Sequence, residues 1–245
     1  MIEKDTVTSK IKNMIEKDTV KPRIKNIIVS ICTIVIIICI AAFALITVNL
    51  LSKEEFSYAD SLNDTVLTVE NENISLKEIS YYILVAETNY NEAANIYNEE
   101  NPHAFWNMAL NMKYFRNRVK QSVIDACTRD NVYYQQALKE GYTLKEEELE
   151  EINDKALEEI SKMTDWQMKL TDYQMSDMVN VLTKIAYSRK YAENLMAEGY
   201  TAQELDVDGS KYEEIKKDYA VSINQKIWKN ITLGKVTINN EDAAR

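Results

Sequence analysis

The residue types that most often carry catalysis are sparse in this 245-residue chain. Its single histidine, His103, follows Asn101 and Pro102, and no second histidine or usable cysteine accompanies it to build a zinc site. No nucleophile motif gives His103 a general-base role. The four glycines are isolated, so the chain has neither a phosphate-binding loop nor a dinucleotide fingerprint. We predict a protein that is not an enzyme and that uses no cofactor.

A run of acidic side chains is the next candidate for chemistry, because carboxylates bind hard cations. Its members are Glu146, Glu147, Glu148, Glu150, Glu151, Glu158 and Glu159. The run lacks the turn glycine and the alternating ligands of a calcium loop. We therefore interpret it as the solvated face of a helix and predict no metal site.

The remaining candidates for function are aromatic and flexible apolar side chains, which could bind a partner. The part of the chain after residue 51 holds 15 Tyr, three Trp and seven Met. Flexible thioethers and amphipathic rings suit irregular peptide partners, although the same stripe is typical of a helical core. The residues that we predict to bind polypeptide are Tyr82, Tyr90, Trp106, Met108, Met112, Phe115, Met175 and Met178.

A 25-residue stretch at 27–51 contains no charged side chain and lies between Lys25 and Lys53. As a helix it would reach roughly 38 Å, which exceeds the ~30 Å hydrocarbon core of a bilayer. We predict a transmembrane helix at 27–51. Seven basic and four acidic side chains precede it, so the positive-inside rule predicts a single-pass protein of the cell membrane, with a cytoplasmic tail at 1–26 and an extracytoplasmic main domain.

Two alternatives to a permanent anchor remain open. The triplet at 42–44 (AFA) matches a signal-peptidase pattern, although cleavage there would leave an apolar new terminus. A lipoprotein signal fits less well, because Cys32 and Cys39 each follow an isoleucine where lipidation needs a small residue. The tail is a 13-residue tandem repeat, so the true start is either Met1 or Met14.

The predicted exported part, 52–245, carries 22 basic and 35 acidic side chains (29 less 7, and 39 less 4), a net charge of −13. This charge argues against a nucleic-acid partner, which needs a basic surface. Only Cys127 lies in this part, so it closes no internal disulfide. Residues 52–64 are polar and aperiodic and predict a juxtamembrane linker, with a folded domain at 65–245.

The folded domain is predicted to be mostly α, because four glycines and two prolines are too few for a many-stranded sheet. Apolar residues that recur every three or four positions indicate long helices. They are expected from 76 to a point before Asn101 and Pro102, and at about 104–140, 144–162, 172–198 and 211–230. Two short segments, 65–69 and 234–238, are strand-like. Since a lone terminal strand needs a partner, we predict that they pair in a sheet of two or three strands.

Local signals support these helix boundaries. Gly141 and Gly199 predict left-handed helix ends, and Asn71 or Asn73 predicts a left-handed turn after the first strand. Capping boxes, in which two side chains satisfy free backbone donors, are predicted at five helix starts. They are Ser75 with Glu78, Thr143 with Glu146, Thr164 with Gln167, Thr171 with Gln174, and Thr201 with Glu204.

The order of these elements resembles a known family. Residues 69–78 (VENENISLKE) are similar to the V-N-G-x-x-I-[ST]-x-x-[EQ] opening of the SurA/PrsA-type foldases, and 137–149 (ALKEGYTLKEEEL) resembles a second family segment. The helical domains of these foldases also resemble the trigger factor carboxy-terminal domain. The resemblance implies a polypeptide-holding domain at 65–245. It also implies that the parvulin isomerase domain is missing, since about ten residues separate Gly199 from the last predicted helix.

We therefore expect a membrane-anchored extracytoplasmic chaperone without isomerase activity. Its partners would be unfolded or newly exported polypeptides, held in a cleft between long helices, and its surfaces also allow a homodimer. The alternative is a dedicated scaffold or assembly subunit that binds one partner of the cell envelope. An isomerase with an unrecognised site is a third, weaker hypothesis.

Overall fold

The computed structural model describes residues 38–40, 56–101, 103–110, 113–234 and 236. The chain divides into two compact units, Met1–Glu55 and Phe56–Arg245. In the first unit residues 38–40 are helical. The rest of the predicted transmembrane segment and the tail at 1–26 lie outside the described residues. None of the helices in the described ranges combines the length and apolar character that a membrane crossing demands.

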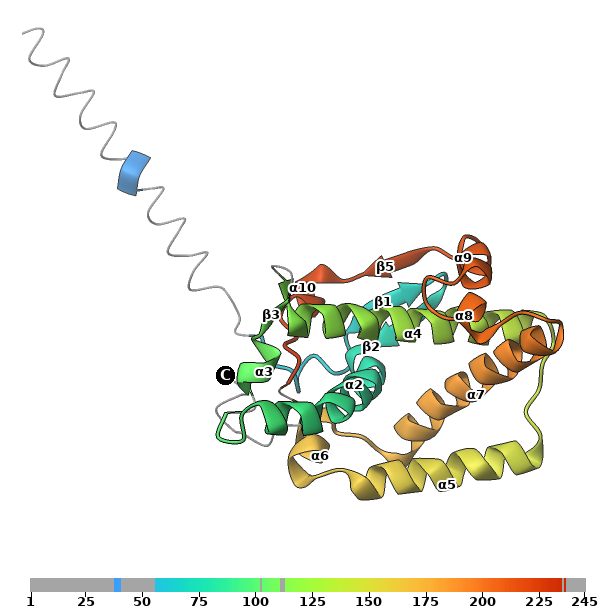
Figure 1. The fold of residues 1–245 in the computed structure, drawn as a ribbon, viewed down its shortest axis with the longest axis horizontal. Coiled ribbons are helices and arrows are strands. Elements are labelled where there is room, and N and C mark those ends of the chain that lie inside the picture. Colours follow the sequence, from blue (N-terminus) through green and yellow to red (C-terminus); the bar gives the residue numbers. More distant parts are fainter. Residues whose placement is uncertain (1–37, 41–55, 102, 111–112, 235, 237–245) are drawn as a thin grey trace, which may run out of the picture. The chain divides into compact units, whose positions relative to one another are not determined.

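The second unit is mostly helical with a small antiparallel sheet, as the sequence predicts (Figure 1). Its helices are α2 (Leu76–Tyr97), α3 (His103–Trp106), α4 (Phe115–Lys139), α5 (Glu146–Lys162), α6 (Asp165–Thr171), α7 (Met175–Ala197), α8 (Ala202–Leu205), α9 (Ser210–Lys216) and α10 (Gln225–Trp228). The main sheet contains β1 (Thr65–Val69), β2 (Glu72–Ser75) and β5 (Val221–Ile223), and β3 (Ala109–Leu110) pairs with β4 (Lys113–Tyr114).

The sheet joins the two ends of this unit, but through a different segment than predicted. Strand β1 lies between β2 and β5 and is antiparallel to both, with Leu67 opposite Ile223. In the predicted strand 234–238, the two described positions, 234 and 236, are not in a strand. Gly234 has a φ of +84° and donates its N–H to the buried Glu87 carboxylate at 2.6 Å. The backbone therefore turns where we expected it to extend.

The turn between β1 and β2 also differs from the prediction. Glu70, rather than Asn71 or Asn73, has the positive φ of 53°. Its N–H donates to the Ala220 carbonyl at 2.7 Å, and its carboxylate accepts the Ala220 N–H at 2.8 Å. Glu70 thus holds the residue that leads into β5, which offsets the cost of a left-handed glutamate.

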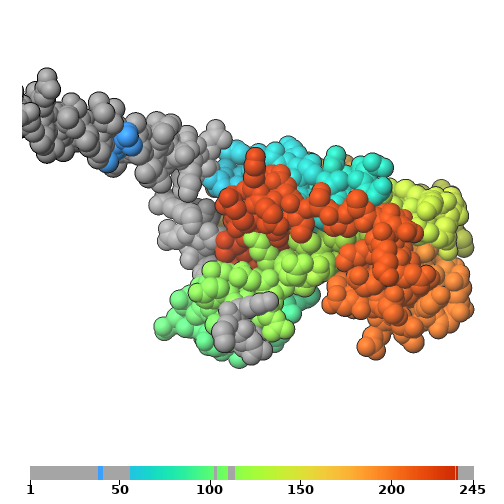
Figure 2. All heavy atoms as spheres, turned by 90° about the horizontal axis from the view of Figure 1, so that it is seen from above, coloured from blue at the N-terminus to red at the C-terminus, as the bar shows by residue number. Residues whose placement is uncertain are grey.

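The core lies between the sheet and the helices α2, α4 and α7. Val66 and Leu67 of β1, Ile74 of β2 and Ile83 of α2 have no exposed surface. The carboxyl-terminal segment, red in Figure 2, lies between the β1–β2 hairpin (cyan) and α4 (green). Lys120 of α4 donates to two backbone carbonyls in and just after α10, which fixes this segment against the helix.

Two predicted helices are interrupted in the structure. The segment 104–140 divides into α3 and α4, because the chain turns back through β3 and β4 and the Phe115 N–H donates to the Met108 carbonyl at 2.8 Å. The segment 211–230 divides into α9, β5 and α10. In both cases the apolar spacing continues across the break, since the flanking pieces face the same core.

The predicted helix caps are partly confirmed. The boxes at Thr164 and Thr201 form both hydrogen bonds, and the Ser75 hydroxyl accepts the Glu78 N–H. Gly141 and Gly199 have positive φ values, as predicted. Two boxes are wrong. Helix α5 begins after Lys145, whose N–H donates to the Glu148 carboxylate, and Thr171 is the last residue of α6 rather than the cap of α7.

Thr201, which caps a helix, and Thr143, which does not, give a matched pair of variants. Thr201→Ala removes a hydroxyl that accepts the Glu204 N–H, so we expect the free energy of unfolding to fall by about 1 kcal/mol. Thr143→Ala removes an exposed hydroxyl two residues before the actual cap of α5, so we expect a change within about 0.5 kcal/mol. Urea unfolding followed by circular dichroism measures both. Equal losses would show that the caps are misplaced.

Candidate functional site

Four of the eight predicted polypeptide-binding residues gather at one end of the second unit. They are Tyr90 on α2, Trp106 on α3, Met108 after it and Phe115 at the start of α4. Met108 and Phe115 are half-buried and pack against the core. Met112 lies outside the described residues.

The rings at this end pack edge to face. The Tyr90 ring centroid lies 5.0 Å from that of Phe115 and 6.1 Å from that of Trp106. Phe105 lies 4.8 Å from Phe115 and 6.0 Å from Tyr97, which extends the cluster to the end of α2. T-shaped pairs at these distances stabilise by about 0.5–1.5 kcal/mol each beyond their burial.

This cluster has a buried base and an exposed rim. Trp106 is 1% exposed, whereas Tyr97 is 54% and Ile96 79% exposed. Tyr114, next to Phe115, is also exposed. We call this surface the aromatic end, and it consists of Tyr90, Ile96, Tyr97, Phe105, Trp106, Tyr114 and Phe115.

The exposed rim was not predicted from the sequence. Ile96 lies outside the apolar stripe of α2, in which Tyr90, Ala93 and Tyr97 recur every three or four residues. An isoleucine that lies off the apolar stripe of an amphipathic helix faces solvent, so the position of Ile96 could have predicted its exposure. Glu92 and Glu99 flank Ile96 and Tyr97 around an open hollow of about 930 Å³. The rim is therefore apolar with acidic neighbours.

The other predicted residues do not join the aromatic end. Tyr82 of α2 is buried, and its hydroxyl donates to the Asp130 carboxylate at 3.2 Å. Met178 of α7 is 1% exposed and belongs to the core, while Met175 is exposed at the start of α7. Because Tyr82, Trp106 and Met178 are core side chains, the eight residues do not line one cleft between long helices.

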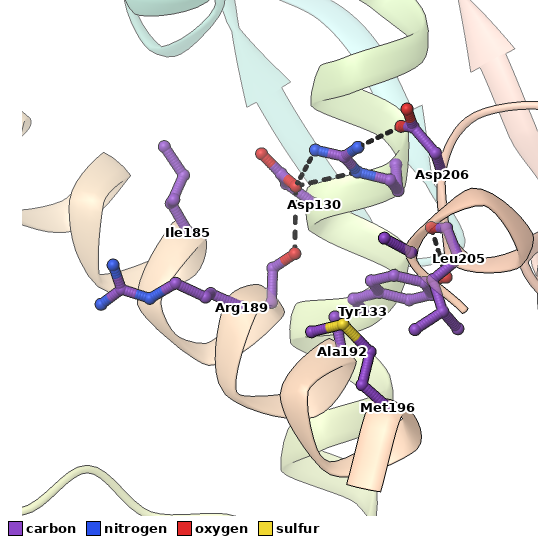
Figure 3. A pocket seen from close by; sticks show the side chains of 11 residues that line it. Asp130, Tyr133, Ile185, Arg189, Ala192, Met196, Leu205 and Asp206 are labelled. Atoms are coloured by element: carbon purple, nitrogen blue, oxygen red, sulfur yellow. Dashed lines mark hydrogen bonds and ion pairs between the residues drawn. The ribbon is translucent and has the colours of Figure 1, made fainter. Parts of the chain in front are cut away.

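A separate pocket of about 430 Å³ lies between α4, α7 and α8 (Figure 3). Its apolar side is formed by Ile185, Ala192, Met196 and Leu205. The Tyr133 hydroxyl donates to the Leu205 carbonyl at 2.8 Å, which fixes the end of α8 against α4. This pocket was not predicted from the sequence, because its residues come from three separate helices.

The polar side of the pocket is a chain of hydrogen bonds around Asp130, which is 7% exposed. One carboxylate oxygen accepts the Ser188 hydroxyl at 3.0 Å and faces the Arg129 Nε and Nη2 at 3.4 and 3.3 Å. The other oxygen accepts from Tyr82. Arg129 also donates through Nη1 to Asp206 at 2.5 Å, so two carboxylates contact one guanidinium (Figure 3).

Burial controls the protonation of this network. Desolvation raises the pKa of Asp130 above its usual range, although Arg129 and Ser188 act against that shift. Burial would lower the pKa of Arg129, but Asp130 and Asp206 raise it. The nearby Cys127 is fully buried and its thiol pKa is raised by desolvation, so it is an unreactive core residue.

The acidic run of the sequence lies on α5. Glu148 pairs with Lys190 at 2.7 Å and Glu158 with Lys162 at 2.5 Å, and the remaining glutamates of the run face solvent or are half-buried. Within the described ranges, no three His, Cys, Asp or Glu side chains are placed to hold a metal ion. The run contributes charge and ion pairs to the surface of α5.

Comparison with known proteins yields no match to any family model, curated protein or solved structure. Among the described residues, the aromatic end and the pocket are two surfaces that offer chemistry for binding. They differ in chemistry, since the first is apolar and open while the second combines a guanidinium with an apolar wall.

Proposed function

We propose that the unit Phe56–Arg245 binds unfolded or newly exported polypeptides at its aromatic end and acts as a chaperone without isomerase activity. In this proposal the segment 27–51 anchors the chain in the cell membrane and the helical unit lies outside the cell. The observation that carries the proposal is the exposure of Ile96 and of its neighbour Tyr97, whose ring packs on Phe105 of the aromatic base.

The energetics suit reversible binding. Burying one large apolar side chain contributes about 1.5–3 kcal/mol, so Ile96 and Tyr97 together favour weak contacts that exchange quickly. The buried rings of Phe105 and Trp106 hold the base rigid, so little conformational entropy is lost on binding. The flanking acidic residues favour client segments that combine basic and apolar side chains.

The internal spacing supports a role without proline isomerisation. Helix α7 ends at Ala197 and α9 begins at Ser210, and only the four-residue α8 lies between them. A parvulin domain of the family that the sequence resembles does not fit in this interval. Binding and release would therefore depend on affinity alone, with no nucleotide or cofactor.

The proposal predicts a specific loss of holding activity. The full-length chain, purified in lipid nanodiscs, should suppress light scattering by a chemically denatured client at stoichiometric amounts. In the double variant Ile96→Ser and Tyr97→Ser, we expect about tenfold more protein to be needed, because two exposed contacts are truncated. The matched control is Leu157→Ser, which removes an equally exposed side chain from α5.

Two results would contradict the proposal. One is equal suppression by the double variant and the wild type, and the other is equal loss in the α5 control. Crosslinking from membranes separates the chaperone from the scaffold alternative, since many substoichiometric clients support a chaperone and one stoichiometric partner supports a scaffold.

A further inference from the structure

We propose that the pocket between α4, α7 and α8 binds an aliphatic carboxylate, that is, a carboxylate group attached to a short apolar chain. This site lies apart from the aromatic end, because Arg129 and Phe115 are 14 residues apart on α4, or about 21 Å. Such a ligand is either a small free acid or the carboxyl terminus of a polypeptide that ends in an aliphatic residue.

The guanidinium of Arg129 supplies the recognition group. It has five N–H donors, and its contacts with Asp130 and Asp206 account for one at each of its three nitrogens. Two N–H donors, one on each terminal nitrogen, are not used by those contacts. A planar guanidinium with adjacent donors matches the two oxygens of a carboxylate.

The present partners of Arg129 leave it available. Its distances to Asp130 are 3.3 and 3.4 Å, longer than the 2.7–2.9 Å of a strong charge-assisted hydrogen bond. Its other partner, Asp206, has a side chain that is 64% exposed. A ligand carboxylate can therefore displace Asp206, which water then solvates, while Asp130 keeps its bonds to Ser188 and Tyr82.

The apolar wall selects the rest of the ligand. Figure 3 shows Met196 and Ala192 beside the Tyr133 ring, on the side of the pocket away from Asp130. Met196 is partly exposed, and its unbranched side chain adapts to irregular shapes. A volume of about 430 Å³ suits a carboxylate with one aliphatic side chain and is at the small end for ligand pockets.

Other ligand classes fit less well. A cation would be repelled by the Arg129 guanidinium, which contacts both carboxylates of the pocket, Asp130 and Asp206. A phosphate would need a more polar lining than Ile185 and Leu205 provide. The aliphatic carboxylate is the class that uses both the guanidinium and the wall.

Calorimetric titration of the full-length chain in nanodiscs tests this site. The probes are acetyl-leucine and an acetylated hexapeptide that ends in leucine, each compared with its carboxamide. We expect each carboxylate to bind about tenfold or more tightly than its amide, since a charged hydrogen-bond pair is lost in the amide. Tighter binding of the hexapeptide than of acetyl-leucine identifies a chain terminus as the ligand, and equal binding identifies a small acid.

Variants locate the binding to this pocket. Arg129→Lys keeps the charge but removes the planar pair of donors, so the preference for carboxylate over amide should become clearly smaller. Ala202→Trp fills the pocket from an exposed position of α8, so it tests the site even if the Arg129 variant fails to fold. Lys162→Gln on α5 is the control and should bind as the wild type. Equal binding of acid and amide, or undiminished binding by Ala202→Trp, would overturn the proposal.

Discussion

Replacing Trp106 with alanine is expected to lower the free energy of unfolding by about 3–5 kcal/mol, the usual cost of removing a large buried aromatic side chain. Trp106 is nearly inaccessible, and its ring contacts Tyr90, Phe105 and Phe115. It also packs against Gly234, where an added Cβ would lie 2.6 Å from the ring. Its loss would therefore loosen both α3 and the carboxyl-terminal segment. Urea unfolding followed by circular dichroism measures the change.

The control for this prediction comes from the same surface. Ile96→Ala removes a side chain that is largely exposed, so the free energy of unfolding should change by no more than about 0.5 kcal/mol. The variant Trp106→Phe keeps an aromatic ring and removes an indole N–H that has no hydrogen-bond partner among the described residues, so it should be milder than alanine. If Trp106→Ala and Ile96→Ala had equal effects, the base of the aromatic end would not be packed.

Removing the Asp130 carboxylate is the second change that we expect to lower the free energy of unfolding strongly. Asp130→Ala would leave the half-buried Arg129 with Asp206 as its remaining carboxylate partner, and it would remove the acceptor of Ser188 and Tyr82. Leaving a buried donor without its acceptor costs about 1–3 kcal/mol, and this variant leaves two such donors. Asp130→Asn keeps the shape and one oxygen, so it should cost clearly less in the same urea experiment. An Asn variant as unstable as the Ala variant would contradict this account.

The pH dependence of these variants has a defined sign. Because burial raises the folded-state pKa of Asp130, its protonated form favours folding. This contribution is full below the unfolded pKa of about 4 and is lost as pH rises through the folded value. The stability of the wild type relative to Asp130→Asn should therefore decline as pH rises above about 4.

Glu148 is a control, because its contribution to stability should change with pH in the opposite direction. Its hydrogen bond with Lys190 lowers its pKa in the folded state, so its contribution is present above the unfolded pKa and lost as pH falls through the folded value. The wild type should lose stability relative to Glu148→Gln on acidification. Measurements of unfolding at several pH values test both signs. If the contributions of Asp130 and Glu148 to stability changed with pH in the same direction, the directions assigned to their pKa shifts would be refuted.

Helix positions in this unit were largely predictable from the sequence. Helix α2 begins at Leu76 and ends before Asn101, as predicted, and α5 and α7 begin only two or three residues after their predicted starts. Apolar spacing succeeds there because one continuous helix packs one face on the core. It fails at 107–114, since spacing records which side chains face the core but not whether the backbone between them is continuous.

The candidate sites were less predictable, because exposure depends on which helices meet. Met178 and Tyr82 resemble the rim of the aromatic end in residue type, yet Tyr82 of α2 is covered by α4 and Met178 of α7 is buried in the shared core. The pocket combines Arg129 of α4 with Ser188 of α7 and Asp206 after α8, which are up to 77 positions apart. No local pattern in a single sequence indicates that such residues meet.

Because β1 lies between β2 and β5, the sheet cannot be completed until β5 has been synthesised. Leu67 pairs with Ile223, which follows it by 156 residues (223 less 67). At roughly 5–20 residues per second, the ribosome needs about 8–30 s to add that interval. During this time one edge of β1 has no strand beside it. Each nascent chain thus passes through a stage in which the unpaired edge of β1 must be kept from pairing with another chain. Clients of the proposed chaperone would need the same protection.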